Sequence, residues 1–329
     1  MIQLQLQVCT LGLQGLERLA RTQRPRVDGV EYLVSCQLPI EKSAQASTNE
    51  DAQAFANEDD AQASANEVAV QAIATNQAEV LQLASDELKA FLQREDVKLH
   101  IIHSRGVSKN RNNALSLATA PLSLLSDDDV DYTAEGLQAI IQAFEQAPQA
   151  DVISFQFWQG EKPNQGEQQN QGEKQNQSQK FYPDKAFHHQ HPPKGFYISV
   201  IEIAFRTKKV QAHCRFNENF GIGAEHFPSG EEDILLKDML KAGLNCVYEP
   251  ICICSHPSLS TGTKRFADPA FLQCKGAIFS YIHPNTWLLR LVKGAITEGR
   301  KKRVSPWIFL SNTLKGVCLA KRLKVFSRR

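Results

Sequence analysis

Long apolar runs are absent from this sequence of 329 residues. No stretch approaches the roughly 18 to 20 continuous apolar residues of a membrane-spanning helix, and the N-terminus lacks the basic start and long apolar core of a signal peptide. We therefore expect a soluble or peripheral protein in the cytoplasm. A hydrophobic content of 42% is enough for one large α/β domain, alone or with an appendage.

Clustered cysteines are also absent. The eight cysteines are scattered, which excludes a small disulfide-rich scaffold and favours reduced thiols. Cys252, Cys254 and His256 are expected to share one face of a strand, but their spacing lacks the paired pattern of zinc ligands. We therefore expect buried cysteines that pack as small hydrophobes, with zinc as the alternative. Three further histidines are expected to be solvated, with an acceptor-binding loop as the alternative: His188, His189 and His191.

Acidic residues almost disappear from the C-terminal segment. From Trp287 to Arg329 there are twelve Lys and Arg residues and one acid, Glu298, although the whole chain has a net charge of only +1. Apolar residues are interleaved with the basic ones, as in helices that lie on anionic lipid. We expect residues 266–329 to form a basic amphipathic helical extension on an anionic membrane surface. A plain helical extension is the alternative, and no recognisable module supports nucleic-acid binding.

Two internal segments contain few residues that could be buried. Residues from about 41 to 77 repeat NEDAQAFA and NEDDAQASANE, and residues 160–180 are rich in Gln, Asn, Gly and charge. Neither segment can bury enough apolar surface to offset the cost of ordering it. We expect two low-complexity inserts that carry no chemistry.

Strand and helix patterns alternate through the rest of the first half, which predicts an open, mostly parallel sheet. Gln3, Gln5 and Gln7 predict a polar face on the first strand, although a central parallel strand is usually buried on both faces. The expected strands are residues 2–8, 31–36, 97–103, 121–126 and 151–158, and the expected helices are residues 15–23, 108–120 and 133–147.

Three consecutive aspartates, Asp127, Asp128 and Asp129, follow the fourth strand in the stretch LLSDDDV. Ligands of open α/β sheets bind beyond the carboxyl ends of the strands. In extended backbone Asp127 and Asp129 point to one side, where two carboxylates suit Mg²⁺ or Mn²⁺ together with substrate phosphates. A solvated acidic turn before the helix that begins near Thr133 is the alternative.

Two other segments offer groups that complement such a site. In RGVSKNRNNAL, a helix N-terminus with Ser108, Arg111 and Asn112 is suited to phosphate. In GEEDILL, Glu232 and Asp233 open an amphipathic helix behind a glycine-rich stretch, where a carboxylate can serve as a general base. Acids in a first helical turn are also common because of the helix dipole alone.

The order of these motifs resembles that of the inverting family 2 glycosyltransferases. GVSKNRNNAL looks like the family's Gly-x-Ser-x-x-Arg-Asn segment, LLSDDDV its Asp-x-Asp strand end and GEEDILL its Glu-Asp helix start. RFNENFGIGAEHFPSGEED and YEPICICSHPSLSTG resemble a branch that makes bacterial surface polysaccharides. The resemblance covers about residues 1–262 and implies a single glycosyltransferase-A (Rossmann-like) domain over residues 1–265.

The resemblance also implies roles for individual residues. Asp233 is implied as the base, with Glu232 as its substitute, and a divalent cation, Mn²⁺ or Mg²⁺, is implied at Asp127, Asp129 and His256. An aspartate pair that reads the nucleotide base in many members is missing after the second strand, where Ser35 and Gln37 stand. The implied donor-binding residues are Gln37, Ser108, Arg111, Asn112, Asp127 and Asp128.

The implied activity is the transfer of a sugar from a nucleotide diphosphate to a glycan or lipid-linked acceptor at the inner face of a bacterial plasma membrane. A nucleotidyltransferase with a similar sheet is one alternative, but the N-terminal region has no glycine-rich basic phosphate loop. A catalytically degenerate, membrane-bound assembly partner is the other. The presence of both the aspartate triplet and the Glu-Asp helix start makes that alternative less attractive.

Overall fold

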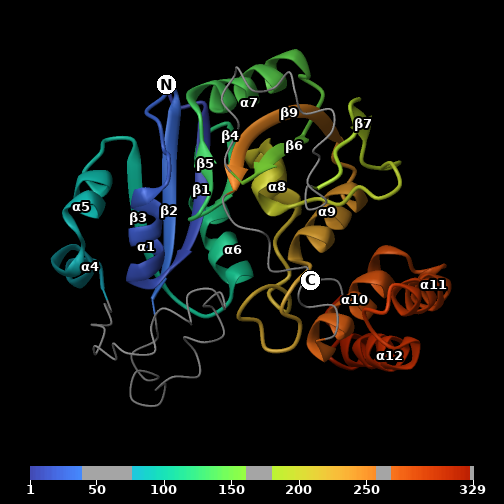
Figure 1. Cartoon of the computed structure of the whole chain (residues 1–329). Coiled ribbons are helices and arrows are strands. Elements are labelled where there is room, and N and C mark those ends of the chain that lie inside the picture. The colour runs from blue at the N-terminus through green and yellow to red at the C-terminus, as the bar shows by residue number, and fades with distance from the viewer. Residues whose placement is uncertain (39–75, 161–179, 257–267, 327–329) are drawn as a thin grey trace.

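The computed structural model describes residues 1–38, 76–160, 180–256 and 268–326 (Figure 1). The interiors of both expected low-complexity inserts therefore lie outside the described residues. The described chain is a mixed α/β structure built around one large sheet, so the predicted fold class is confirmed. Its strands are β1 Leu4–Leu11, β2 Val30–Leu38, β3 Val97–His103, β4 Leu122–Asp127, β5 Asp131–Tyr132, β6 Val152–Gln159, β7 Phe187–His188, β8 Ile203–Arg206 and β9 Cys246–His256.

The sheet has the strand order β3-β2-β1-β4-β8-β6-β9-β5, with β7 paired to β9. The first four strands in this order are parallel, β8 is antiparallel to both of its neighbours, and β6 and β9 are parallel. The sheet is therefore mostly parallel along its longer strands, as predicted. The carboxyl ends of β1, β2 and β4 meet at one edge, which is the lower edge of the sheet in Figure 1.

Helices cover both faces of the sheet. They are α1 Gly12–Arg21, α4 Gln77–Leu83, α5 Asp86–Leu92, α6 Val107–Leu117, α7 Ala134–Gln146, α8 Thr207–His213, α9 Glu231–Lys241, α10 Pro269–Ile282, α11 Trp287–Arg300 and α12 Pro306–Arg322. The helix and strand patterns of the first half are thus confirmed within a few residues. Sequence reasoning missed α4 and α5, although the side chains of Asn76 and Ser85 cap them as expected for N-cap residues.

The polar residues of the first strand do not form a solvated face. β1 lies between β2 and β4 in the sheet and is buried along nearly all of its length. The side chains of Gln5 and Gln7 are buried and hydrogen-bonded instead. Gln5 donates to Glu31, 2.5 Å away, and its carbonyl oxygen accepts from the backbone amides of Thr119 and Ala120. Buried amides with such partners satisfy the rule that buried polar groups are paired.

The expectation that Cys252, Cys254 and His256 share one face fails because β9 is irregular there. Cys252 is paired with Gln156 and Cys254 with the next residue of β6, Phe157, so the register shifts between them. β9 therefore has one extra residue between these two pairs, and such a β-bulge interrupts the alternation of side chains between the two faces. Within the described residues no three His, Cys, Asp or Glu side chains are grouped closely enough to hold a metal ion. Cys254 is buried, as expected for a small hydrophobe.

His189 also departs from its expected solvated state, whereas His188 and His191 are exposed. The side chain of His189 is buried, and its Nε2 lies 2.8 Å from the Ser154 hydroxyl. Burial lowers the pKa of His189 to about 4, so the ring is neutral at physiological pH. Its position beside the ring of Phe187 marks it as part of the core.

The C-terminal residues form three helices, α10, α11 and α12, that pack against one another. A small hydrophobic core joins these helices to the sheet domain. In it, Ile278 of α10 packs with Ile234 of α9 and with Phe220 and Phe227, which precede α9. Tyr281 of α10 also donates a hydrogen bond to Asp238 of α9. In the part of the chain that is described, none of the helices has the length and apolar character needed to cross a bilayer.

Candidate active site

The three consecutive aspartates lie at the carboxyl edge of the sheet, but they point toward different partners. β4 ends at Asp127, and Asp128 and Asp129 form a turn rather than extended backbone. The prediction that Asp127 and Asp129 point to one side because of strand alternation therefore rests on a wrong local conformation. The turn instead directs each carboxylate to its own neighbour.

Asp128 points into the protein and holds the first helix in place. Its carboxylate accepts hydrogen bonds from the Thr10 hydroxyl at 2.5 Å and from Arg18 Nε at 2.9 Å. A Cβ on Gly15 would lie 2.7 Å from this carboxylate, so only glycine leaves room for the contact. Burial raises the pKa of Asp128 although Arg18 and Thr10 oppose the shift. These contacts leave Asp128 as a structural residue of the turn.

Asp129 turns toward the end of β9. Its Oδ2 lies 3.3 Å from His256 Nε2, so the structure brings together two of the three predicted metal-binding residues. Burial acts to raise the pKa of Asp129, but the hydrogen bond and charge of His256 outweigh it, and the pKa lies below its ordinary value. Asp129 is therefore ionised at neutral pH.

Arg111 is the central residue of the site because it bridges two separate acidic segments. Its Nη2 donates to Asp127 Oδ1 at 3.0 Å and its Nη1 to Glu231 Oε1 at 2.7 Å. Burial acts to lower the pKa of Arg111, but these two carboxylates outweigh it and raise the pKa above its ordinary value. The bridge joins α6 and the end of β4 to the start of α9, where Glu231 lies 120 residues beyond Arg111 along the chain.

Arg24, which sequence reasoning missed, fixes the aspartate turn from behind. Its guanidinium is buried and donates to the carbonyl of Asp127 at 2.9 Å and to the carbonyl of Val130. It also lies over the ring of Tyr132, 5.1 Å from the centroid. An isolated Arg in a polar loop carries no sequence signal of this role, because its partners are backbone atoms about a hundred residues away.

Three of the predicted donor-binding residues are engaged inside the protein. Ser108 donates to the carbonyl of Phe220 at 2.6 Å, and Asn112 exchanges hydrogen bonds with the backbone of Phe216. Gln37 donates to Ser104 at 2.8 Å and to the carbonyl of Gly106 at 3.1 Å. Ser35 likewise accepts a hydrogen bond from Asn113. These contacts order the loops around the site, and direct contact with a donor stays a prediction for each residue.

Helix α9 begins at the site and carries the two predicted catalytic carboxylates. Gly230 caps it with φ of 86°, a left-handed conformation, and a Cβ there would lie 2.0 Å from Ile278 Cδ1. Burial and the neighbouring charge of Glu231 raise the pKa of Asp233 to about 6. Burial also raises the pKa of Glu232 well above its ordinary value, assisted by Glu231 and Asp233. A carboxylate with a pKa near 6 is suited to accept a proton at neutral pH.

A buried ion pair lies close to these carboxylates. Lys180 Nζ lies 2.7 Å and 2.6 Å from the two carboxylate oxygens of Glu202, and both side chains are almost fully buried. The rings of Tyr182 and Tyr197 surround the ammonium at 5.1 Å and 4.4 Å. The charge of Lys180 is close enough to lower the pKa of Asp233. Lys180 ends a segment that was expected to contain few residues that could be buried, and its side chain is buried nonetheless.

We expect Lys180→Met to lower the free energy of unfolding by about 3–5 kcal/mol, because it leaves the buried charge of Glu202 without a partner. The double variant Lys180→Met/Glu202→Gln should recover most of this loss. Urea denaturation measures both changes. Lys185→Met, at an exposed neighbouring lysine, serves as the control and should change stability by no more than about 0.5 kcal/mol. If the single and double variants lost the same free energy of unfolding, the ion pair between Lys180 and Glu202 would be contradicted.

The carboxylates at the turn have the chemistry that suits a divalent cation, since such cations prefer oxygen ligands, but among the described residues they and His256 are not gathered into a metal site, because Asp127 is paired with Arg111 and Asp129 with His256. The side chains of Asp127 and Asp129 remain 34% and 29% exposed, so both carboxylates can be reached from outside. Two carboxylates are enough for Mg²⁺ or Mn²⁺ when substrate phosphates and water supply the other ligands. His256 is close enough to Asp129 to orient that carboxylate or to become a further ligand.

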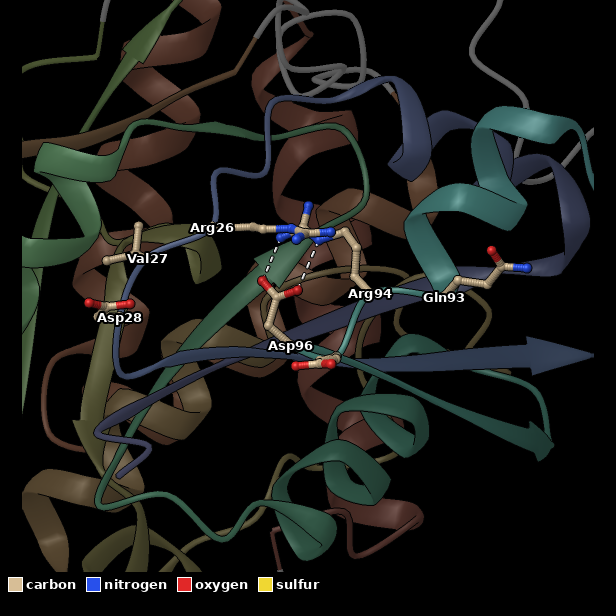
Figure 2. A pocket seen from close by; sticks show the side chains of 7 residues that line it. Arg26, Val27, Asp28, Gln93, Arg94 and Asp96 are labelled. Atoms are coloured by element: carbon tan, nitrogen blue, oxygen red, sulfur yellow. Dashed lines mark hydrogen bonds and ion pairs between the residues drawn. The ribbon is translucent and has the colours of Figure 1, made fainter.

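A polar cavity of about 470 Å³ lies at the opposite edge of the sheet, before the amino ends of β2 and β3 (Figure 2). Arg94 and Asp96 line it and form a two-point ion pair, with distances of 2.9 Å and 2.5 Å. Arg94 also donates to the backbone carbonyl of Arg24. These groups satisfy one another, and ligands of such sheets bind at the carboxyl ends of the strands. We therefore place the functional site at the aspartate turn.

The family description "Glycosyl transferase family 2" matches residues 83–205. The matched segment contains Arg111 and the aspartate turn, whereas Asp233, His256 and the three C-terminal helices lie outside it. The match supports a family 2 glycosyltransferase. Comparison with curated proteins gives no significant match.

Solved structures of similar fold include the S. aureus protein TarS. A crystal structure of TarS residues 1–349 has a TM-score of 0.50 at 13% sequence identity, and the alignment covers 98% of this chain and 92% of that one. A longer TarS structure has a TM-score of 0.45 at 15% identity and covers 84% of this chain, but this chain spans only 39% of its length. The mannosyltransferase PcManGT from Pyrobaculum calidifontis, solved with GDP-Man and Mn²⁺, has a TM-score of 0.43 at 13% identity, covering 97% and 75% of the two chains.

Proposed function

We propose that the protein is a glycosyltransferase that transfers a sugar from a nucleotide-diphosphate donor to a hydroxyl of a glycan or lipid-linked acceptor, with inversion at the anomeric carbon. The observation that carries this proposal is the Arg111 bridge. It connects Asp127, inside the family match, to Glu231, the residue before Glu232 and Asp233. This bridge supports the proposal that the donor-binding and acceptor-activating groups act at one site.

In this proposal Asp233 takes the proton from the acceptor hydroxyl as the hydroxyl oxygen attacks the anomeric carbon. A bond forms from that oxygen to the anomeric carbon, and the bond from the anomeric carbon to the diphosphate oxygen breaks. Direct displacement from the opposite face inverts the anomeric centre. The raised pKa of Asp233, about 6, supports its assignment as the base because it then binds a proton more strongly than an ordinary aspartate.

Asp127 and Asp129, with His256 beside them, are the residues that would hold a divalent cation. When bound, such a cation neutralises charge on the leaving diphosphate. Arg111 keeps Asp127 in position, and Arg24 fixes the turn through its carbonyl contacts. Arg18 and Thr10 hold Asp128 and so fix the middle of the same turn.

We assign the acceptor to bacterial surface-polysaccharide synthesis, at the inner face of the plasma membrane. The motif resemblance supports this assignment, as does the basic C-terminal unit, which provides a means of reaching a lipid-linked acceptor. The proposed acceptor is a growing glycan on a lipid carrier.

The proposal is tested by incubating the protein with UDP-sugars and GDP-sugars, Mn²⁺ and lipid-linked oligosaccharides from cells that lack this enzyme. Mass spectrometry should detect an acceptor that gains one sugar residue, and NMR should show an anomeric configuration opposite to that of the donor. Release of pyrophosphate instead of a nucleoside diphosphate would identify a nucleotidyltransferase. Retention of the donor's configuration would contradict the proposed direct displacement.

A further inference from the structure

Exposed apolar side chains gather on the last two helices. Among the described residues, eight of the sixteen exposed large hydrophobic side chains belong to residues 287–326. Leu289 is 72% exposed and Trp307 is 78% exposed, which are the largest values in this group. Exposed apolar residues are ordinary when scattered singly, but a group on one small unit marks an interaction surface. The others are Leu288, Val292, Ile296, Ile308, Leu314 and Leu323.

On α11 these side chains share one face. Leu288, Val292 and Ile296 recur at intervals of four residues, and Leu289 extends the same face. A different face, with Leu291 and Ala295, is buried. The core of the helical unit is therefore formed without the exposed face, which remains available to a partner.

The second helix of the pair lies alongside the first. Pro306, at the start of α12, packs on Gly299 near the end of α11, and Lys321, near the end of α12, lies 5.7 Å from the ring of Trp287 at the start of α11. The two helices are thus antiparallel, and Trp307 follows directly after the contact with Gly299. Both helices contribute exposed apolar side chains to one compact unit, at the lower right in Figure 1.

Basic residues lie near the exposed apolar ones, and the described part of α11 and α12 has no exposed acidic residue. The acid in the described residues 287–326 is Glu298, which is buried and paired with Arg303 at 3.5 Å. Lys293 and Arg300 are exposed beside the apolar face of α11. Further basic residues surround the pair: Arg290, Lys301, Lys302, Lys315, Arg322 and Lys324. A surface with apolar side chains, basic residues and no exposed acid complements an anionic bilayer.

We propose that the exposed face of α11 and the start of α12 form a bilayer-docking face, in which Leu288, Leu289, Val292, Ile296 and Trp307 enter the interface of an anionic membrane while Lys293 and Arg300 contact lipid phosphates. The inference deepens the proposed function and rests on it, because an enzyme that extends a lipid-linked acceptor works at a bilayer. Amphipathic helices of this composition lie in the plane of the interface with their apolar face buried.

The docking face is attached to the catalytic helix. Ile278 of α10 packs directly on Gly230, the N-cap of α9, and Lys241 of α9 lies 3.6 Å from the ring centroid of Tyr281. In Figure 1 the three C-terminal helices lie toward the edge to which the parallel strands run. Docking through α11 and α12 would therefore hold the start of α9, with Glu232 and Asp233, near the membrane.

Flotation with lipid vesicles tests the proposal on the full-length protein. We expect binding to vesicles that contain phosphatidylglycerol, and at least about tenfold weaker binding to pure phosphatidylcholine vesicles or at high salt. Leu289→Glu/Trp307→Glu changes two highly exposed side chains and should also weaken binding at least about tenfold. The matched control is Leu81→Glu/Leu83→Glu, which places the same charges on the exposed side chains of α4 and should bind like the wild type.

A second readout uses Cys318, an exposed cysteine on α12 in a chain whose other cysteines are buried or half-buried. A nitroxide attached there should lose mobility when phosphatidylglycerol vesicles are added. Donor titration separates failure of this inference from failure of the proposed function, because the variants of the docking face should bind the donor like the wild type. Equal vesicle binding by Leu289→Glu/Trp307→Glu, or binding of RNA with no binding of vesicles, would overturn the bilayer-docking face.

Discussion

Asp233→Asn should reduce sugar transfer by about 10²–10⁴-fold, which is the usual contribution of a general base. Asparagine has nearly the same shape but cannot accept the proton of the acceptor hydroxyl. The donor is held by other residues in the proposed mechanism, so its dissociation constant should change by less than about threefold. The comparison of kcat with donor binding therefore separates a loss of chemistry from a loss of the site.

The pH dependence provides an independent test of the same residue. Burial and Glu231 raise the pKa of Asp233 to about 6, so the carboxylate is protonated below that pH and ionised above it. Because the base is active only when ionised, kcat/KM of the wild type should fall about tenfold per pH unit below 6 and level off above it. The residual activity of Asp233→Asn should lack this decline.

Glu232→Gln is the matched control for Asp233→Asn, because it removes a carboxylate from the same turn of α9. If Asp233 is the base, Glu232→Gln should retain most of the transfer activity and the decline below pH 6. If Glu232→Gln abolishes transfer and Asp233→Asn does not, the two roles are exchanged. Loss of donor binding in both variants would contradict a catalytic role for either residue.

Asp129→Asn should weaken metal-dependent donor binding by at least about 100-fold. Changes to residues that merely support metal ligands cost about 10- to 100-fold in metal affinity, and the loss of a ligand should cost no less. Calorimetric titration of the donor with and without Mn²⁺ measures the effect. In the absence of metal the variant and the wild type should bind the donor equally weakly.

Asp131→Asn is a suitable control for this prediction. Asp131 lies two residues away, and its carboxylate accepts a hydrogen bond from the backbone amide of Gln23. Because its carboxylate is engaged by that backbone amide, Asp131→Asn should keep metal-dependent donor binding within about threefold of the wild type. Metal dependence that survives intact in Asp129→Asn would show that Asp129 is not a ligand.

The alternation of strands and helices could be predicted from the sequence because each element carries its own periodicity. The position of the aspartates at the carboxyl edge followed from their place directly after an apolar strand. The buried amides of Gln5 and Gln7 could not be predicted, because their partners, such as Glu31 and Ser123, come from other strands of the sheet. Hydrophobic patterns assign a polar side chain to solvent unless such partners are known.

The directions of the three aspartates were not predictable either. Each is set by residues distant in sequence: Arg111 for Asp127, Arg18 for Asp128 and His256 for Asp129. Lys180 was missed for a related reason. It ends a polar, low-complexity segment, and its role depends on Glu202, which sequence patterns do not connect to it.

Calorimetric titration of UDP, GDP and CMP into the wild-type protein, with and without Mn²⁺, is the most direct test of a donor site at the aspartate turn. We expect UDP or GDP to bind only when Mn²⁺ is present, whereas CMP, which has one phosphate, should bind weakly or not at all. Equal binding with and without the metal would contradict the assignment of Asp127 and Asp129. Absence of binding by every nucleotide, in protein shown to be folded, would contradict a donor site at the aspartate turn.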